Sequence, residues 1–215
     1  MKIPDNLPLD KAAPILCAGV TMYDPLRHWG AVQAGKDGKK MCIGIIGVGG
    51  LGTMGIKLAH AMGHRVVAIT TSAGKTDMAK AKGADAVVVS TDAASMAAEV
   101  GSCDIILNTV AAPHELGHYL SLVAESGTLV QLGVLAEAHS VCQLPLIFQR
   151  KSIAGSLIGG IASTEECLEF CALHNITPDT ENVTADKIDW VYNQLCTANK
   201  DGIRYVLDIK ASKAM

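Results

Sequence analysis

The feature that most constrains the fold is a glycine-rich turn between an apolar strand and an apolar helix. Met41–Gly47 has the length and β-branched content of a buried strand, and Leu51–Met62 has apolar residues at helical spacing. The turn between them, Gly47-Val48-Gly49-Gly50-Leu51-Gly52, satisfies the pattern GxGxxG. In this setting the pattern is typical of a dinucleotide-binding βαβ unit. The alternative is a glycine-rich turn in a buried sheet that binds nothing.

The spacing gives each glycine a separate role. Gly47 and Gly49 allow a tight turn and close approach of the backbone to a pyrophosphate, while Gly52 lets the helix pack closely on the strand. The helix N-terminus adds free N–H groups and the positive end of the helix dipole. We therefore expect the whole turn to bind the cofactor: Gly47, Val48, Gly49, Gly50, Leu51 and Gly52.

Runs of strand length alternate with segments of helical period over most of the chain. Because helices separate the strands, the sequence predicts an α/β fold, a doubly wound parallel sheet (Rossmann fold) of about six strands. The C-terminal part predicts a helix near Asp186–Cys196 and a strand, Arg204–Ile209, whose place relative to the sheet stays open. The other expected strands are Arg65–Thr70, Ala86–Val89, Cys103–Val110, Thr128–Gly133 and Ser152–Ile158, and the other expected helices are 9–31, Lys75–Lys82, Pro113–Ala124 and one capped by Ser163-Thr164-Glu165-Glu166.

Composition excludes several classes of protein. The 215 residues carry 18 Lys and Arg against 21 Asp and Glu, so charge gives no reason to bind nucleic acid. Seven cysteines without a CxxC pair argue against a disulfide framework or a four-cysteine zinc site, and they favour a reducing compartment. The N-terminus lacks a signal-peptide pattern, and the apolar stretch Met41–Ile56 is too short to span a bilayer. We expect a cytoplasmic protein with no membrane partner.

The end of the second strand indicates which dinucleotide is bound. NAD sites usually place an acidic residue there to hold the ribose 2′-hydroxyl. This chain instead has Thr70-Thr71-Ser72-Ala73-Gly74-Lys75, whose three hydroxyls and one lysine suit a 2′-phosphate. The segment favours NADP(H) over NAD(H). Taken alone, Lys75 would be an ordinary solvated helix residue.

The segment Pro14-Ile15-Leu16-Cys17-Ala18-Gly19-Val20-Thr21-Met22-Tyr23-Asp24-Pro25-Leu26 resembles zinc-dependent medium-chain alcohol dehydrogenases, in their cinnamyl-alcohol-dehydrogenase-like, NADP-dependent branch. The resemblance covers nearly the whole chain. Further matching segments are Gly47–Gly52, Thr70–Lys75, Asp104–Val110, Leu129–Val134, Ser152–Gly160 and Arg204–Ile209.

The resemblance implies roles for individual residues. Cys17 matches one protein ligand of a catalytic zinc, although by composition alone it would be a small buried residue. Thr21 matches a residue that approaches the nicotinamide end of the cofactor. Thr109 and Gly133 match strand-end residues that face the cofactor, and Ser156-Leu157-Ile158 match the lining of the nicotinamide pocket. In the family, zinc acts as a Lewis acid while hydride passes between an alcohol or aldehyde and the nicotinamide.

The resemblance also implies that a front domain, with the other zinc ligands and most of the substrate pocket, lies outside this chain. One cysteine cannot hold a catalytic zinc, which needs about three protein ligands. We expect residues 1–39 to form a connecting segment with the Cys17 helix, 40–175 the NADP-binding Rossmann domain, and 176–215 a segment that packs on the front domain. That packing predicts an exposed apolar face around Val206 and Ile209. Thr53 stands where the family often has histidine.

Two main functions stay open. The chain is either the NADP(H)-binding part of an alcohol dehydrogenase, its front domain lost or supplied by another polypeptide, or an NADP(H)-binding module without turnover. A zinc-free, quinone-reductase-like activity is a third possibility, which Cys17 disfavours. The resemblance also implies a homodimer joined through the sheet edge near Ser156–Gly160.

His114-Glu115-Leu116-Gly117-His118 matches HExxH, the helix motif of zinc proteases. On the expected helix the two histidines lie opposite the apolar stripe of Leu116, Leu120 and Val123, so they would face solvent. No third ligand follows the motif, so we do not expect a protease. A short-chain dehydrogenase is also excluded, because no tyrosine is followed by lysine four residues later.

Overall fold

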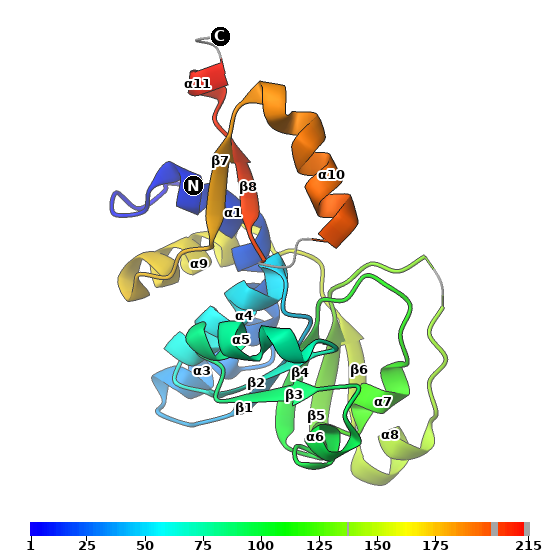
Figure 1. Cartoon of the computed structure of the whole chain (residues 1–215). Helices are drawn as coiled ribbons and strands as arrows, with labels where there is room; N and C mark the ends of the chain where they lie inside the picture. The colour runs from blue at the N-terminus through cyan, green and yellow to red at the C-terminus, as the bar shows by residue number, and fades with distance from the viewer. Residues whose placement is uncertain (137, 199–201, 213–215) are drawn as a thin grey trace.

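The computed structural model describes residues 1–136, 138–198 and 202–212. Its main body is a six-stranded sheet in the order β3-β2-β1-β4-β5-β6, with every pair parallel (Figure 1). This confirms the predicted doubly wound sheet. The strands are β1 (Cys42–Ile46), β2 (Arg65–Thr70), β3 (Ala86–Val89), β4 (Cys103–Asn108), β5 (Val123–Gln131) and β6 (Ser152–Gly155).

Helices cover both faces of the sheet, and each face has its own hydrophobic core. Every residue of β1 is buried, as expected for a central strand with helices on both sides. One face packs against α1 (Leu9–Pro14), α2 (Val20–His28), α3 (Ala31–Lys36), α4 (Gly50–Ala61), α5 (Thr76–Ala81) and α9 (Ile161–His174). The other packs against α6 (Ala93–Ala97), α7 (Leu116–Leu120) and α8 (Leu144–Gln149).

The first helical region runs from Leu9 to His28, close to the predicted helix over 9–31, but a π-helical turn interrupts it at Ile15–Gly19. Cys17 lies in this turn, where its carbonyl oxygen accepts a hydrogen bond from Thr21 Oγ1 at 2.7 Å. Such turns widen a helix locally and are frequent at functional sites. The two residues singled out in this region are therefore fixed next to each other.

The C-terminal residues form a separate small unit, which settles their place relative to the sheet. Strands β7 (Thr180–Val183) and β8 (Arg204–Leu207) pair in parallel, joined by α10 (Ile188–Ala198) and followed by α11 (Ile209–Ser212). In Figure 1 this unit lies beside α1 and above α9, clear of the six-stranded sheet. Within the described residues, no helix combines the length and hydropathy needed to cross a membrane.

An ionic clamp joins this unit to the helices of the sheet. The Asp179 carboxylate accepts from Lys82 Nζ at 2.7 Å and from Lys57 Nζ at 3.2 Å. Lys57 also donates to the carbonyl oxygen of Thr177 at 2.7 Å. These bonds hold the segment before β7 against α4 and α5.

Several predicted elements have other bounds in the structure. Strand β5 covers Val123–Gln131 instead of Thr128–Gly133, and the last strand ends at Leu207, before Ile209. The helix expected over Pro113–Ala124 is reduced to α7, and Val123–Ala124 already belong to β5. Strand β6 ends at Gly155, not Ile158. Helix α9 begins at Ile161 with Gly160 as N-cap, because Ser163 and Thr164 do not cap it: Ser163 Oγ donates to Asp24 Oδ1, and Thr164 Oγ1 donates to the Gly160 carbonyl oxygen.

Candidate functional site

The glycine turn after β1 has the shape of a cradle that only glycine permits. Gly47 has φ +92°, a left-handed conformation that disfavours other residues. A Cβ atom on Gly52 would lie 1.8 Å from the Gly47 carbonyl oxygen, so the helix sits against the strand end. A Cβ atom on Gly49, in contrast, would meet nothing within 4 Å. Open space thus lies above the middle of the turn, where a ligand can approach the backbone.

Helix α4 starts directly from this turn. Its N-cap is Gly49, and no described side chain caps it. Twelve residues long, the helix directs unpaired N–H groups and the positive end of its dipole toward the open space. Leu51 is half-buried and Val48 is buried, so the apolar residues of the turn pack inward and leave the backbone facing the open space. This arrangement can bind a pyrophosphate.

The segment after β2 turns back toward the same place. Lys75 ends a short 3₁₀ turn, Ala73–Lys75, and its Nζ donates to the Val48 carbonyl oxygen at 2.8 Å. It is half-buried, so the reading of Lys75 as an ordinary solvated helix residue is wrong for this structure. Thr70 is buried, and its Oγ1 accepts from the Ser72 backbone N–H. The exposed members of the segment are Thr71, Ser72, Ala73 and Gly74.

The ends of β4 and β5 complete one wall of the turn. Thr109 Oγ1 donates to the Ile46 carbonyl oxygen at 2.8 Å. A Cβ atom on Gly47 would lie 2.6 Å from the same Thr109 Oγ1. A Cβ atom on Gly133 would lie 2.3 Å from the Val110 carbonyl oxygen. The structure therefore brings Thr109 against the glycine turn and Gly133 against Val110, the residue after Thr109.

Arg204, which the sequence placed only in a strand, lies on the first turn of α4. A Cβ atom on Gly50 would meet Arg204 Cδ at 2.7 Å and Nη1 at 3.5 Å. Gly202 lies against Gly49, since a Cβ atom built on Gly202 would lie 3.2 Å from the Gly49 carbonyl carbon. The C-terminal unit thus places a cation at the helix N-terminus. Nothing local in the sequence signals this contact between distant segments.

A family model described as zinc-binding dehydrogenase matches residues 50–173, more than half of the chain. The chain belongs to this family of zinc-binding dehydrogenases. The resemblance found in the sequence is thereby confirmed.

Three relatives illustrate the similarity. The chain is 51% identical over 201 residues to the aldehyde reductase YahK of Escherichia coli, a match that spans 93% of this chain and 56% of the relative. It superimposes on a cinnamyl alcohol dehydrogenase from Sorghum bicolor with a TM-score of 0.92 and 36% identity, over 100% of this chain and 60% of that one. For the CAD from Helicobacter pylori complexed with NADP(H), the TM-score is 0.83 at 32% identity, over 99% and 58%. This zinc-binding dehydrogenase chain therefore spans less than two thirds of these relatives.

Cys17 does not belong to a metal site built from the residues described here. Its thiol is exposed, and Arg204 Nη2 lies 3.7 Å from Sγ. Among the described residues, no group of three or more His, Cys, Asp or Glu could hold a metal ion. A guanidinium beside the sulfur would also repel a metal cation. This part of the zinc-binding dehydrogenase fold offers at most one ligand, too few for zinc.

The end of β4 carries a buried polar network that the sequence did not reveal. Asn108 is fully buried and its Nδ2 donates to Gln131 Oε1 at 2.7 Å. The Val110 N–H donates to Asn108 Oδ1, which fixes the orientation of the amide. Asn108 Nδ2 also lies 2.8 Å from His114 Nε2, so that nitrogen accepts and Nδ1 donates to the Ala112 carbonyl oxygen. A polar residue closing an apolar strand was the only sequence signal.

This network corrects the interpretation of the HExxH motif. His114 precedes α7 rather than lying on it, and it is half-buried instead of facing solvent. His118 is exposed as expected, and its Nε2 lies 3.0 Å from the Ser90 carbonyl oxygen. The two histidines therefore do not share a helix face, and they are not part of any group of three possible metal ligands among the described residues.

The remaining predicted site residues lie toward the sheet edge. Thr21 is buried in α2, and the Ser156 N–H donates to the Gln131 carbonyl oxygen at 3.1 Å. Leu157 and Ile158 extend past the end of β6 with 76% and 46% of their surface exposed. The structure thus brings Ser156 beside β5 and leaves the next two side chains uncovered.

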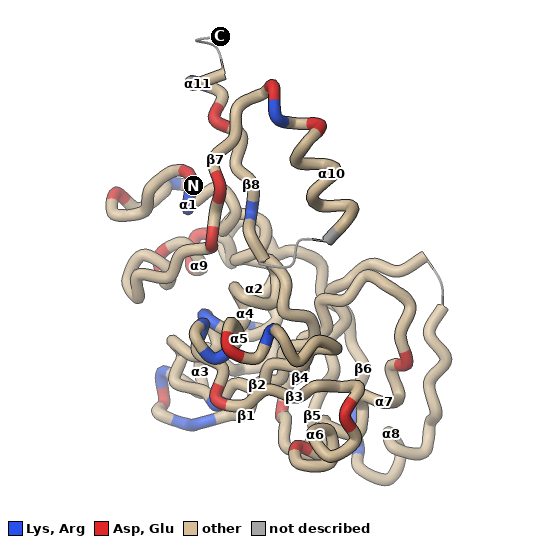
Figure 2. The backbone as a smooth tube through the Cα atoms, in the orientation of Figure 1, with Lys and Arg blue, Asp and Glu red and all other residues tan. Residues whose placement is uncertain are grey.

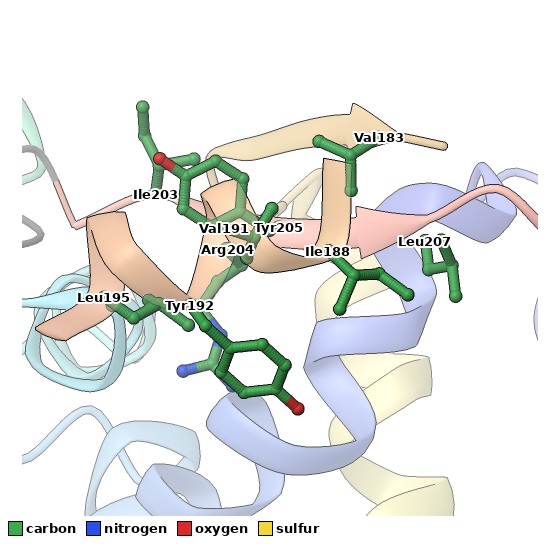
Figure 3. Close-up of a pocket in the computed structure, with 10 residues that line it drawn as sticks. Val183, Ile188, Val191, Tyr192, Leu195, Ile203, Arg204, Tyr205 and Leu207 are labelled. Carbon is green, nitrogen blue, oxygen red and sulfur yellow. The ribbon is translucent and has the colours of Figure 1, made fainter. Parts of the chain in front are cut away.

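An apolar groove of about 380 Å³ adjoins the glycine turn, between α10 and the β7–β8 pair (Figure 3). Of the two residues expected to mark an exposed apolar face, Ile209 is 54% exposed and Val206 is half-buried, so the expectation holds only at Ile209. Figure 2 shows that α10 carries no charged residue beyond its first turn. The groove is lined by Gly50, Val183, Ile188, Val191, Tyr192, Leu195, Ile203, Arg204, Tyr205 and Leu207.

Proposed function

We propose that this chain binds NADP(H) at the glycine turn and forms the cofactor-binding part of an oxidoreductase that transfers hydride between NADP(H) and a primary alcohol or aldehyde. The observation that carries the proposal is the junction of Lys75 with the open glycine turn, at a strand end that has no carboxylate. The names of relatives support it, since one is an aldehyde reductase and another was solved with NADP(H).

Different residues of the chain would bind different parts of the cofactor. The N–H groups at the start of α4 and the Arg204 guanidinium would hold the pyrophosphate, because both present positive charge to the open space above Gly49. Ser72 and Lys75 would hold the 2′-phosphate. Thr109 and Gly133 would face the part of the cofactor that leads to the nicotinamide. The nicotinamide supplies or accepts the hydride.

We place Thr21, Ser156, Leu157 and Ile158 along the path toward the nicotinamide, and Cys17 as a ligand that contributes to zinc only together with residues outside this chain. Cys17 lies one helical turn before Thr21. The described residues lack two further metal ligands. The chain by itself therefore binds cofactor without turnover.

The apolar groove supports the proposal that a further protein segment covers this face. The relatives extend well beyond the part that this chain matches. A large exposed apolar surface on a folded chain is typical of an interface. We propose that the front part of the dehydrogenase, as part of the same protein or as a separate chain, packs against α10.

We also propose a homodimer joined through the free edge of β6. This strand ends the sheet order, and an unpaired strand edge can pair with a second copy. Leu157 and Ile158 are exposed beside it. A cytoplasmic location accords with the free thiols of all seven cysteines, which would persist in a reducing compartment.

The test is titration of the 215-residue chain with NADPH and NADH, followed by a zinc-supplemented assay of benzaldehyde or cinnamaldehyde reduction. We expect binding of NADPH at least ~10-fold tighter than NADH, and no turnover. Absence of NADPH binding, or equal affinity for both nucleotides, would refute the cofactor assignment. Turnover would refute the statement that this chain lacks a complete catalytic site.

A further inference from the structure

Two thiols lie close together at the N-terminal ends of two central strands, on the side of the sheet opposite the glycine turn. Cys42 begins β1 and Cys103 begins β4, and these strands are neighbours. Their Sγ atoms lie 3.9 Å apart. Because all six strands are parallel, their N-terminal ends lie on one side of the sheet. Their carboxyl ends, with the proposed cofactor site, lie on the opposite side. The pair therefore has no part in the site described above.

An arginine lies directly on one of the two sulfurs. Arg65 Nη1 donates to Cys42 Sγ at 3.2 Å, and the guanidinium also binds both carboxylate oxygens of Glu99, at 2.9 and 2.5 Å. The two hydrogen bonds to Glu99 fix the guanidinium in place, so the positive charge of Arg65 stays beside the Cys42 sulfur. No basic side chain hydrogen-bonds to Cys103 within the described part of the chain, and its Sγ lies 3.5 Å from Ser102 Oγ.

The surroundings make the two thiols unequal. The hydrogen bond from Cys103 and the Arg65 guanidinium lower the pKa of Cys42 to about 7, although burial opposes this. The same contact with Cys42 and deep burial raise the pKa of Cys103. Cys42 is thus the more acidic thiol of the pair and the one that more readily forms a thiolate, while Cys103 keeps its proton and donates to it.

We propose that Cys42 and Cys103 are an oxidation site for hydroperoxides, in which Cys42 reacts first and Cys103 resolves the product as a disulfide between β1 and β4. Cys42 is 9% exposed, and Arg65, which covers it, keeps 36% of its side chain exposed, so a molecule as small as hydrogen peroxide needs only a side-chain movement to enter. Closing the 3.9 Å gap to a bond of about 2.05 Å takes an approach of about 2 Å.

The chemistry balances with peroxide as the only oxidant. The Cys42 thiolate attacks one peroxide oxygen, the O–O bond breaks, and hydroxide leaves while the sulfur becomes a sulfenic acid. The Cys103 thiol then attacks that sulfur. The S–S bond forms, the S–O bond breaks, and the departing hydroxide takes the Cys103 proton as water. Two thiols and one peroxide give one disulfide and two waters.

Other cysteines provide internal comparisons. Cys167 and Cys171 are also a buried pair, four residues apart on α9, but no arginine contacts them among the described hydrogen bonds. The hydrogen bond with Cys171 and burial raise the pKa of Cys167. Peroxide should therefore leave this pair reduced. The exposed cysteines are Cys17, Cys142 and Cys196.

The test uses the full chain with the three exposed cysteines replaced by serine. After hydrogen peroxide at neutral pH, remaining thiols are alkylated and tryptic peptides are mapped without reduction. We expect peptide 41–57 linked to peptide 83–150, while both cysteines of peptide 152–187 are alkylated. Alkylation of Cys42 and Cys103 after peroxide, or a disulfide between Cys167 and Cys171 in their place, would overturn the proposal.

Single variants then assign the order of reaction. Cys103→Ser should accumulate a sulfenic acid on Cys42 that dimedone traps, and Cys42→Ser should leave Cys103 unreacted. Arg65→Gln should slow disulfide formation at least ~5-fold, and Arg65→Lys by less, because it keeps the charge. Circular dichroism checks the folding of each variant. If a variant unfolds, the parent decides: loss of the Cys42 and Cys103 thiols no faster than loss of the Cys171 thiol under the same peroxide exposure refutes activation of Cys42.

Discussion

Lys75 donates from Nζ to the Val48 carbonyl oxygen at 2.8 Å, so the segment after β2 is tied to the glycine turn before any cofactor binds. The ammonium thus already stands at the junction between the turn and the exposed hydroxyl segment. A phosphate placed there would find it with little rearrangement, which lowers the entropic cost of binding.

Replacing Lys75 by alanine should therefore discriminate between the two nucleotides. We expect NADPH affinity to fall ~10- to 100-fold, the range for one charge-assisted hydrogen bond, and NADH affinity to fall less than ~3-fold. Isothermal titration calorimetry measures both. Lys80→Ala, an exposed lysine on α5, is the matched control and should change neither affinity. Equal losses for the two nucleotides would contradict 2′-phosphate recognition.

Two glycine substitutions should separate stability from binding. Gly52→Ala puts a methyl group 1.8 Å from the Gly47 carbonyl oxygen, so it should destabilise the fold by about 2 kcal/mol or more. Gly49→Ala adds a methyl group to open space, so it should leave the melting temperature nearly unchanged while NADPH binding falls ~10-fold or more.

Thermal denaturation and nucleotide titration of both glycine variants make this comparison. Gly117→Ala, which also meets nothing within 4 Å but lies in α7, controls for the added methyl. If Gly49→Ala binds NADPH normally, the open space above the turn is not the pyrophosphate site.

Arg204→Gln should weaken both nucleotides by the same factor, about 5- to 20-fold, because the pyrophosphate is common to them. This pattern differs from that of Lys75→Ala, which is selective for NADPH. Arg150→Gln, an exposed arginine that caps α8, serves as control. A loss confined to NADPH would move Arg204 to the 2′-phosphate instead.

The Asp179 clamp should give the chain a pH-dependent stability. Burial raises the pKa of this carboxyl, but the ammonium groups of Lys82 and Lys57 lower it more, so its pKa in the folded state lies below the ordinary value. A depressed folded pKa stabilises the fold above the unfolded value of about 3.9, and this contribution is lost as pH falls through the folded pKa. Burial also lowers the pKa of Lys57, and the Asp179 carboxylate opposes this shift.

Asp179→Asn should lower the free energy of unfolding at pH 7 by about 1–3 kcal/mol. Below about pH 4 the difference from the parent should shrink, since the parent then loses the same interaction. Urea denaturation between pH 3 and pH 7 measures this. Asp77→Asn, exposed in the first turn of α5, should show a much smaller effect. A constant difference at every pH would argue against the ionic clamp.

The edge of β6 can be tested by charge. Leu157→Arg should shift a dimer toward monomer in analytical ultracentrifugation, because a buried, unpaired guanidinium opposes association. Leu173→Arg, equally exposed at 77% but on α9, should leave the assembly unchanged. If both variants behave as the parent, the dimer does not use this edge.

The strands around the glycine turn were predictable because their pattern is local. Arg65–Thr70 and Ala86–Val89 were expected with the bounds that the structure shows, since each is a short apolar run between turns. The glycine turn was also predictable, because one Cβ atom at Gly52 would collide with its own strand end. Such steric demands act within a few residues and leave a mark in the sequence.

The contacts that build the rest of the site join segments far apart. Arg204 lies on Gly50, and Lys57 holds Asp179, yet nothing near either position encodes the partner. The same reason explains the misread histidine motif. Spacing suggested one helix face, but His114 lies before the helix and hydrogen-bonds with the Asn108 amide at the end of the sheet. Periodicity does not reveal tertiary partners.

The return of Gly202 and Arg204 to the first glycine turn affects the order of events during synthesis. All six strands of the main sheet lie within residues 42–155, so that sheet can assemble on the ribosome while β8 is still inside the exit tunnel. The cationic wall of the turn arrives only with residues translated some fifty codons later. A nascent chain can therefore be folded at its centre well before it is able to retain a nucleotide.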